Sequence, residues 1–515
     1  MTGPTARIMG TPTVTGNRGL RIEEPLIFEQ GDPGKSGVDL PVPDDRPDRL
    51  GGLMRQGPIG LPGLSEPEVV RHYTRLSQKN YAIDSGIYPL GSCTMKHNPR
   101  LNERMARLPG FADLHPFQPQ STVQGALAVM DALSAWLLSL TGMEAVALSP
   151  AAGAHGELCG MQAIRAALDA RGDGDRRVVL VPDSAHGTNP ATAAQCGFKV
   201  RGIPGDERGR VDLAAFKAAL DDGVAAVMIT NPNTCGLFET DIVALSQAVH
   251  DAGAFVYMDG ANYNAIVGRV RIADLGADAM HINVHKTFST PHGGGGPGAG
   301  PTVLSAALAP FAPLPHVVRD GGGWRLVEHA EGDQHPFGRM KGFHGQFGVF
   351  VRALAYLMSM GKDGLRQASG DAVLNANYLL ARLSEGLTPS YEDGPCMHEA
   401  LFDDRFLKGT GVSTLDFAKA MIDEGFHPMT MYFPLVVHGA MLMEPTETES
   451  KASLDVFCDA VLALAEKARA GDSAFFTEAP RHTPRRRLDE TRAARHPVLR
   501  WEPPAPAPHR VAAQG

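Results

Sequence analysis

Short apolar runs alternate with segments of helical periodicity through the middle of the chain. The strand-like runs are Arg177–Val181, Ala225–Thr230, Ala254–Asp259 and Asp278–Val284. Helical patterns lie between several of them, as in Asp212–Leu220 and Ile242–Ala252. Strands that alternate with helices predict an α/β fold with a mostly parallel sheet and helices on both faces. Ligands of such sheets bind at the carboxyl ends of the strands.

Two charged residues fall at those strand ends. Asp259 closes one run, and Lys286 ends the next, directly before a glycine-rich loop at residues 291–298. Pyridoxal phosphate chemistry needs such a pair. The lysine amine forms a Schiff base with the cofactor aldehyde, and the carboxylate keeps the ring nitrogen protonated so that the ring can accept electrons. Alone, each residue has an ordinary alternative, a surface lysine and a turn-forming aspartate, but the neighbouring His285 and the glycine run favour a cofactor site.

The segment Ser149–Glu157 is the second part of the predicted site. Its small residues open a helix that continues through Ala167. Free N–H groups at Gly153 and Ala154, together with the positive end of the helix, predict a phosphate-binding site. His155 is placed to stack on a pyridine ring, and its alternative is a solvated histidine at a helix start.

Three other residues complete the predicted cofactor site. His285 can donate to a phosphate, and the amide of Asn262, three residues after Asp259, can reach the phenolic oxygen of the ring. Polar loops also follow two strands, Asp183–Pro190 and Asn231–Gly236. Either can be a simple turn, but two such loops at one sheet edge favour a site, and we place Thr188 of the first loop in it.

Composition excludes several other classes of protein. The 515 residues carry a net charge of −9, which argues against a nucleic-acid-binding surface. No run of eighteen apolar residues and no apolar N-terminal signal is present, so we expect no membrane span and no secretion. Six cysteines without a CxxC pair indicate a reducing compartment.

Two motif-like spacings are rejected. His281 and His285 are four apart, but their segment has a strand pattern, so we predict no metal site. Gly293, Gly295 and Gly298 match GxGxxG but enclose a proline and open no helix, so we infer no nicotinamide cofactor.

The chain divides into three predicted regions. Residues 1–120 are an N-terminal arm and helical segment, residues 121–386 a large cofactor-binding domain, and residues 387–515 a smaller α+β domain with an irregular Arg- and Pro-rich tail. The arm carries an apolar patch, Leu26–Phe28. A helix is predicted over Ser121–Leu140, with capping-box spacing at its start, and a long helical region over Val349–Glu385.

Many stretches along nearly the whole chain resemble one family, the glycine cleavage system P-protein, glycine dehydrogenase (decarboxylating), in its two-subunit form, subunit 2. The stretches are Leu26–Glu29, His72–Tyr81, Tyr88–Lys96, His115–Pro119, Ala151–Glu157, Asp183–Pro190, the Lys286 segment, Phe343–Gly345, Phe426–Pro428 and Glu444–Ser450. The chain departs from the family pattern at His438 and in its long tail.

The resemblance implies a fold-type-I pyridoxal-phosphate transferase fold with Lys286 as the Schiff-base lysine. It implies decarboxylation of glycine and transfer of the aminomethyl group to the lipoyl arm of H-protein. It also implies a homologous partner, P-protein subunit 1, in a cytoplasmic heterotetramer.

Two other functions stay open at this point. One is another fold-type-I enzyme, an amino-acid decarboxylase or a cysteine desulfurase, for which Cys235 and Cys396 are the candidate nucleophiles. The other is a non-catalytic scaffold subunit, which the retention of both Lys286 and Asp259 argues against.

Overall fold

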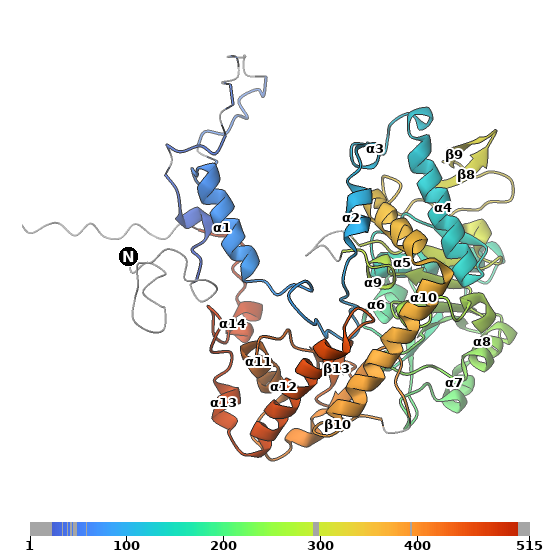
Figure 1. Ribbon diagram of the computed structural model, residues 1–515. Helices are drawn as coiled ribbons and strands as arrows, with labels where there is room; N and C mark the ends of the chain where they lie inside the picture. Colours follow the sequence, from blue (N-terminus) through green and yellow to red (C-terminus); the bar gives the residue numbers. More distant parts are fainter. Residues whose placement is uncertain are drawn as a thin grey trace, which may run out of the picture. The chain divides into compact units, whose positions relative to one another are not determined.

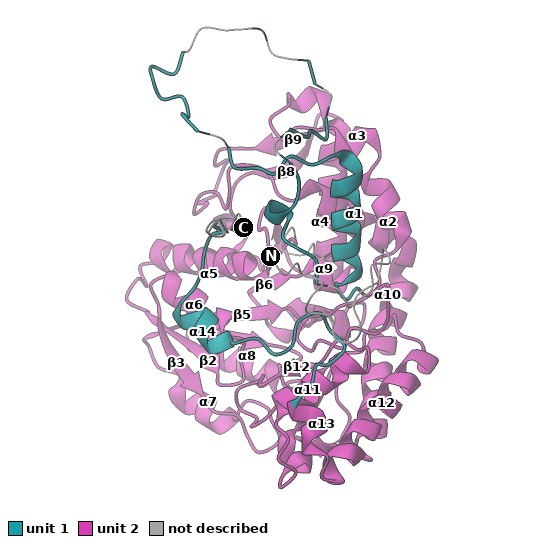
Figure 2. Cartoon of the chain, turned by 90° about the vertical axis from the view of Figure 1, so that its left-hand side faces the viewer, with its two compact units in different colours: residues 1–82, 478–515 teal, residues 83–477 magenta. Residues whose placement is uncertain are grey.

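The computed structural model describes residues 23–502, apart from 33, 39, 42–43, 45–48, 58, 292–297 and 392–393 (Figure 1). The start of the predicted arm, most of the glycine-rich loop after Lys286 and the end of the tail therefore lie outside the described residues. By internal contacts the chain divides into two compact units, residues 83–477 and residues 1–82 with 478–515 (Figure 2).

The larger unit contains a seven-stranded sheet with the order β1-β7-β6-β5-β4-β2-β3. Its strands are β1 (Ala145–Ala147), β2 (Val178–Pro182), β3 (Lys199–Ile203), β4 (Val224–Thr230), β5 (Phe255–Gly260), β6 (Ala279–Ile282) and β7 (Thr302–Leu304). All neighbours pair in parallel except β7, which is antiparallel to both β1 and β6. The predicted mostly parallel sheet is confirmed.

Helices pack on both faces of this sheet. They are α4 (Gln124–Thr141), α5 (Gly153–Ala170), α6 (Thr188–Gln195), α7 (Leu213–Ala219), α8 (Ile242–Asp251) and α10 (Phe347–Leu383). Strand β5 shows the two faces, because successive side chains alternate between them. Val256 and Met258 pack in one core cluster with α4, α7, α8 and α10. Phe255 and Tyr257 pack in the other cluster with α5 and α6.

A smaller antiparallel sheet follows the kinked helix α10, which is interrupted at Gly361 (φ 61°). The sheet has the order β10-β11-β13-β12. Its strands are β10 (Thr388–Pro389), β11 (Ala400–Asp403), β12 (Thr430–Met431) and β13 (Met441–Met443), and its helices are α11 (Thr414–Asp423) and α12 (Lys451–Arg469). The predicted boundary at residue 386 falls between α10 and this α+β part.

The remaining elements belong to the ends of the chain and to short excursions. In the larger unit these include α2 (Arg100–Ala106), α3 (Pro109–Ala112), the one-turn helix α9 (Val284–Thr287), the hairpin β8 (His316–Asp320) and β9 (Gly323–Val327), and α13 (Ser473–Thr477). The smaller unit contains α1 (Glu66–Gln78) and α14 (Glu490–Arg495). In that unit Phe28 of the predicted apolar patch stacks on Trp501, with ring centroids 5.1 Å apart.

The start of helix α4 differs from the prediction. Residues 120–122 form a 3-10 turn, and α4 begins at Gln124 with Val123 at its N-cap and no side-chain cap. The predicted capping box is therefore wrong, because Gln124 Nε2 donates to the carbonyls of Gln120 and Trp324 instead. By length and composition alone α4 could cross a membrane. Its buried residues, however, pack in the core of the sheet domain, as those of a core helix do.

Candidate active site

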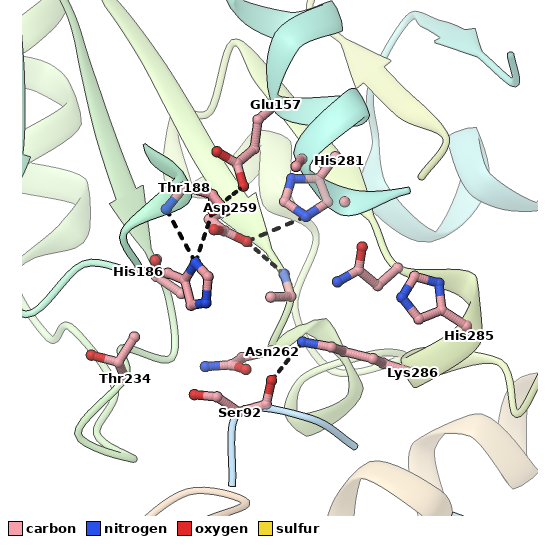
Figure 3. Close-up of a pocket in the computed structure, with 15 residues that line it drawn as sticks. Ser92, Glu157, His186, Thr188, Thr234, Asp259, Asn262, His281, His285 and Lys286 are labelled. Atoms are coloured by element: carbon pink, nitrogen blue, oxygen red, sulfur yellow. Dashed lines mark hydrogen bonds and ion pairs between the residues drawn. The ribbon is translucent and has the colours of Figure 1, made fainter. Parts of the chain in front are cut away.

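A cavity of about 230 Å³ lies at the carboxyl ends of the central strands. Its lining comes from the ends of β4, β5 and β6, the first turn of α5, the loops before α6 and after β4, and the segment around Ser92 (Figure 3). The lining residues are Ser92, Gly153, Ala154, Glu157, His186, Thr188, Thr230, Thr234, Asp259, Ala261, Asn262, His281, Asn283, His285 and Lys286. The sheet topology thus brings Asp259 and Lys286 to one cavity.

Helix α5 reaches the cavity because glycines let it lie close to the sheet. A Cβ atom on Gly156 would come within 2.6 Å of the Cβ of His281, and one on Gly160 within 2.6 Å of the Tyr257 ring. At the end of the helix, a Cβ on Gly153 would come within 2.5 Å of Asn283 Oδ1. No side chain caps this end. Gly153 and Ala154 of this first turn line the cavity, and uncapped N–H groups at the start of a helix favour anions.

Asp259 is a buried carboxylate that several groups hold ionised. Its Oδ2 accepts a hydrogen bond from Asn189 Nδ2 (3.0 Å), and its Oδ1 accepts one from the Ala261 N–H (2.9 Å). His281 lies opposite it in the β5–β6 register, with Nε2 3.4 Å from Oδ1. Burial acts to raise the pKa of Asp259, but His281 and these hydrogen bonds outweigh it and leave the pKa below its usual range.

Glu157 is a second carboxyl group beside Asp259, and its protonation differs. Burial, and then repulsion by Asp259, raises the pKa of Glu157 to about 7. Thr188 and Thr192 donate to its two oxygens at 2.7 and 3.2 Å. Two neighbouring carboxyl groups with pKa values pushed in opposite directions have separate roles in many active sites. Here Asp259 is the anion, and Glu157 holds a proton over part of the neutral range.

Replacing Glu157 with Gln is expected to change the pH dependence of stability. The pKa of Glu157 is about 7 in the folded chain and 4.5 in the free side chain. Between these pH values the unfolded chain loses this proton and the folded chain keeps it. The contribution of Glu157 to stability is therefore full below about pH 4.5 and is lost as pH rises through 7. Glutamine does not ionise. Between pH 5 and pH 8 the free energy of unfolding of Glu157→Gln should therefore gain about 1–3 kcal/mol relative to the parent chain. Chemical denaturation at both pH values measures this difference in the free energy of unfolding, and the variant Glu144→Gln, at an exposed residue, is the control.

Lys286 lies on the opposite side of the cavity from Glu157 and is held by the main chain (Figure 3). Its Nζ donates to the carbonyl of Ser92 at 2.7 Å. The sequence placed Lys286 at the end of a strand, but β6 ends at Ile282 and Lys286 lies on the one-turn helix α9 (Val284–Thr287). Asn283 starts this turn, since its carbonyl accepts from the N–H groups of Lys286 and Thr287. The turn aims the lysine side chain into the cavity.

The other predicted site residues are placed as follows. Gly153, Ala154, Thr188, Asn262 and His285 line the cavity. Asn262 Nδ2 donates to the Pro232 carbonyl at 3.0 Å, so its amide is fixed in orientation.

His155 is not among the lining residues. Its Nδ1 accepts from the Ala151 N–H at 3.1 Å, and burial lowers the pKa of its imidazole, with Lys341 acting in the same direction. Its stacking role stays a prediction.

Sequence reasoning missed several residues that share the cavity. His186 and Thr234 lie in the two polar loops that were singled out, and Glu157 ends the predicted phosphate segment, so position alone could have suggested them. Ser92 lies 194 residues before Lys286, and only the fold brings the two together. His281 was considered only as a metal ligand, although the parallel register of β5 and β6 pairs it with Asp259.

The residues fit pyridoxal phosphate. An ionised carboxylate, an amine and an uncapped helix end share one cavity. Two lining residues also have buried polar atoms without a hydrogen-bond partner among the described residues, Thr230 Oγ1 and Asn283 Oδ1. Such atoms are rare in proteins unless a ligand or water meets them. Fold and site together define a fold-type-I pyridoxal-phosphate enzyme.

Comparisons with known proteins specify the family. Residues 157–296 match the aminotransferase class-V family, and residues 368–479 match the glycine dehydrogenase C-terminal domain. A probable glycine dehydrogenase (decarboxylating) subunit 2 of Caulobacter vibrioides is 67% identical over 97% of this chain and 96% of its own length. That of Kosmotoga olearia is 50% identical over 93% of this chain and 99% of its own. The chain belongs to the glycine dehydrogenase (decarboxylating) subunit 2 family, and its cofactor is pyridoxal phosphate.

Solved structures share the fold at lower identity. A crystal structure of glycine decarboxylase (P-protein) of the glycine cleavage system, in inhibitor-bound form, matches with a TM-score of 0.68 and 23% identity, covering 81% of this chain and 93% of that one. A cysteine desulfurase from Thermococcus onnurineus matches with a TM-score of 0.58 and 15% identity, covering 74% and 95%. At these identities the two structures support the fold alone. The designation subunit 2 implies a partner subunit.

Proposed function

We propose that this chain is the pyridoxal-phosphate-bearing subunit that decarboxylates glycine and passes the aminomethyl group to the lipoyl arm of H-protein. The observation that carries the proposal is the convergence of Lys286 and Asp259 on one cavity in a chain 67% identical to a subunit named for glycine decarboxylation. Glycine, H-protein and a homologous subunit 1 are its proposed partners, in a cytoplasmic heterotetramer.

Each site residue has a proposed role toward the cofactor. The cofactor, when bound, supplies an electron-accepting ring for the pair left by the departing carboxylate. Lys286 would provide the amine that bonds the cofactor aldehyde, and Asp259 would hold a proton at the ring nitrogen. The N–H groups of Gly153 and Ala154, with Thr188 and His285, would hold the phosphate.

The remaining residues would orient the ring. Asn262 would direct its amide toward the phenolic oxygen, and His155 would lie against the ring face. The hydrogen bonds from Asn189 and Ala261 hold the Asp259 carboxylate in place. The carboxylate is thus oriented before any ligand binds, so little reorganisation is needed when the ring nitrogen meets it.

The alternative desulfurase function is disfavoured by the cysteines. Its nucleophile must be a reactive thiolate. Cys235 and Cys396 are both buried, and burial raises the pKa of each thiol to about 12. Neither lines the cavity. The retained Lys286 and Asp259 argue against a non-catalytic scaffold.

Exchange of labelled bicarbonate into the glycine carboxyl group tests the proposed function. The purified chain together with subunit 1 and lipoylated H-protein should catalyse this exchange. The chain with H-protein alone should be poorly active, because the active unit pairs it with the homologous subunit. Full activity without subunit 1 would contradict the proposed partnership, and no exchange in the complete mixture would contradict the reaction. Subunit 1 with H-protein alone is the control.

The stacking role of His155 has its own test. Removing an aromatic contact of this kind costs about 1 kcal/mol, which is about fivefold in affinity. His155→Ala should therefore weaken cofactor binding about fivefold, measured by absorbance titration of the cofactor-free chain. The exposed His329→Ala should bind as the parent does. An unchanged affinity in His155→Ala would remove this residue from the site.

A further inference from the structure

A cluster of three buried polar residues lies beyond the cavity, on the small sheet. His398 and Glu399 precede strand β11, and Glu444 follows strand β13. Because Ala400 pairs with Met443 in this antiparallel ladder, Glu399 and Glu444 face each other where the ladder ends. All three side chains are wholly buried, and one ligand atom from each lies within 4.8 Å of the others. Like charges opposite each other in a sheet are destabilising.

The hydrogen bonds of the two carboxyl groups leave one oxygen of each without a partner. Glu399 Oε2 accepts from the Ser92 N–H at 2.7 Å. Glu444 Oε1 accepts from Thr94 Oγ1 at 2.6 Å and from Asn264 Nδ2 at 3.2 Å. Within the described part of the chain, Glu399 Oε1 and Glu444 Oε2 have no hydrogen-bond partner. A buried carboxylate oxygen without a partner is costly.

No cation among the described residues pairs directly with either glutamate. The ion-pair contacts within 4.0 Å come from His398 alone, at 3.9 and 4.0 Å, and neither of its ring nitrogens has a hydrogen-bond partner. Burial lowers the pKa of His398 to about 3, so its imidazole is neutral. Of the two buried lysines among the described residues, Lys96 pairs with Glu447 at 2.6 Å, and Lys286 donates to the Ser92 carbonyl at 2.7 Å.

One proton bound to the pair would remove the repulsion between two buried carboxylates. One proton on the pair lowers its charge from two to one, and atoms of the two carboxyl groups lie within 4.8 Å of each other, so the groups are close enough for their protonation to be coupled. Burial, followed by repulsion from Glu444, raises the pKa of Glu399 well above its usual range, and burial raises that of Glu444 to about 7. Both directions favour a proton on the pair at neutral pH.

The main chain of Ser92 connects this pair to Lys286. Its N–H donates to Glu399, and its carbonyl accepts from Lys286 Nζ at 2.7 Å. Ser92 has a φ of 60°, a left-handed conformation that residues other than glycine seldom adopt. Contacts on both sides therefore hold it in a strained geometry, as is common at functional sites. The other titratable groups here are Cys93, whose pKa burial raises, and the Lys96–Glu447 pair.

We propose that Glu399 and Glu444 form an acid pair that shares one proton and supplies Lys286 with one compensating negative charge. Neither residue lines the cavity, so both are positioning residues. They act on Lys286 through the main chain of Ser92 and through the electrostatic attraction of their negative charge. The single negative charge attracts the Lys286 side chain whenever its amine is not bonded to the cofactor. The role rests on the proposed function of Lys286 as the reactive amine.

The variants Glu399→Gln, Glu444→Gln and the double variant of the full chain test the pair. If the pair shares one proton, each single variant keeps one negative charge, and only the double variant loses it. The infrared band of a protonated carboxylic acid at pH 7 should therefore lose the same single contribution in all three variants. Loss of two contributions in the double variant, or of none in the single variants, would overturn the shared proton.

The reactivity of Lys286 supplies an independent readout. In the cofactor-free chain at pH 7, the rate at which trinitrobenzenesulfonate modifies Lys286 is followed by peptide mass spectrometry. The single variants should stay within about threefold of the parent. The double variant should react at least about tenfold faster, because the negative charge that restrains the Lys286 amine is gone. Equal acceleration in the single variants would contradict the proposal.

Two controls distinguish a shared proton from a bound cation and from the loss of any buried carboxyl group. Glu239→Gln is the matched control, because Glu239 is also buried and burial raises its pKa to about 7. It should lose an infrared band but leave Lys286 reactivity unchanged. Stoichiometric metal in the parent chain, lost in the single variants, would show that a cation compensates the pair and would overturn the proposal.

If the double variant fails to fold, the infrared result of the single variants decides. Neither readout uses cofactor or glycine, so a failed glycine assay leaves both results standing.

Discussion

Lys286→Ala should lose glycine–bicarbonate exchange by on the order of 10³-fold or more, as expected when the residue that forms the covalent bond is removed. The Nζ of Lys286 is the amine that the fold directs into the cavity, through helix α9 and the Ser92 carbonyl. Without it the cofactor has no covalent attachment, and the visible band of the lysine-bound cofactor should disappear as well.

The matched control for this variant is Lys217→Ala, on the exposed side of helix α7. It should keep both the band and the activity. An alanine variant at 286 that retains near-parent exchange would show that another amine carries the chemistry. Lys96 would then be the first candidate, because it is the other buried lysine among the described residues.

Asp259→Asn should bind the cofactor but lose at least about a hundredfold in exchange activity. A charge-assisted hydrogen bond is about twice as strong as a neutral one, and removing one preorganised electrostatic contact costs about 10²–10³ in rate. Asparagine preserves the shape of the side chain but cannot hold a proton at the ring nitrogen by its charge. The cofactor affinity should change far less than the rate, because the phosphate contacts remain.

The control for Asp259→Asn is Asp183→Asn, an exposed aspartate that directly follows strand β2. Its turnover should equal that of the parent. Near-parent turnover in Asp259→Asn would instead mean that this carboxylate is not the partner of the ring nitrogen.

The sequence predicts those strands whose side chains are buried on both faces. Strands β4 and β5 are buried at every position, and their apolar runs appear directly in the sequence. Strand β3 was missed because Lys199 and Val200 are exposed, which breaks the apolar run. Strands β1 and β7 have only three residues each, too few to form a pattern.

In the site, too, residues with a local sequence signal could be predicted, and contacts between distant segments could not. Asp259 and the α5 segment could be predicted because strand ends and small-residue helix starts are local signals. The contact between Lys286 and Ser92 spans 194 residues, and that between Ser92 and Glu399 spans 307. No local pattern encodes such contacts. They exist because the segment before α2 lies between the small sheet and helix α9 and contacts both.

Borohydride reduction of the cofactor-loaded complex tests the central claim most directly. Reduction fixes the cofactor to the amine that it bonds, and a peptide map then identifies that residue. The structure predicts that the visible band bleaches and that the label lies on Lys286, with Lys96 unlabelled. Label on Lys96 or on any other lysine would contradict the assignment of the active site.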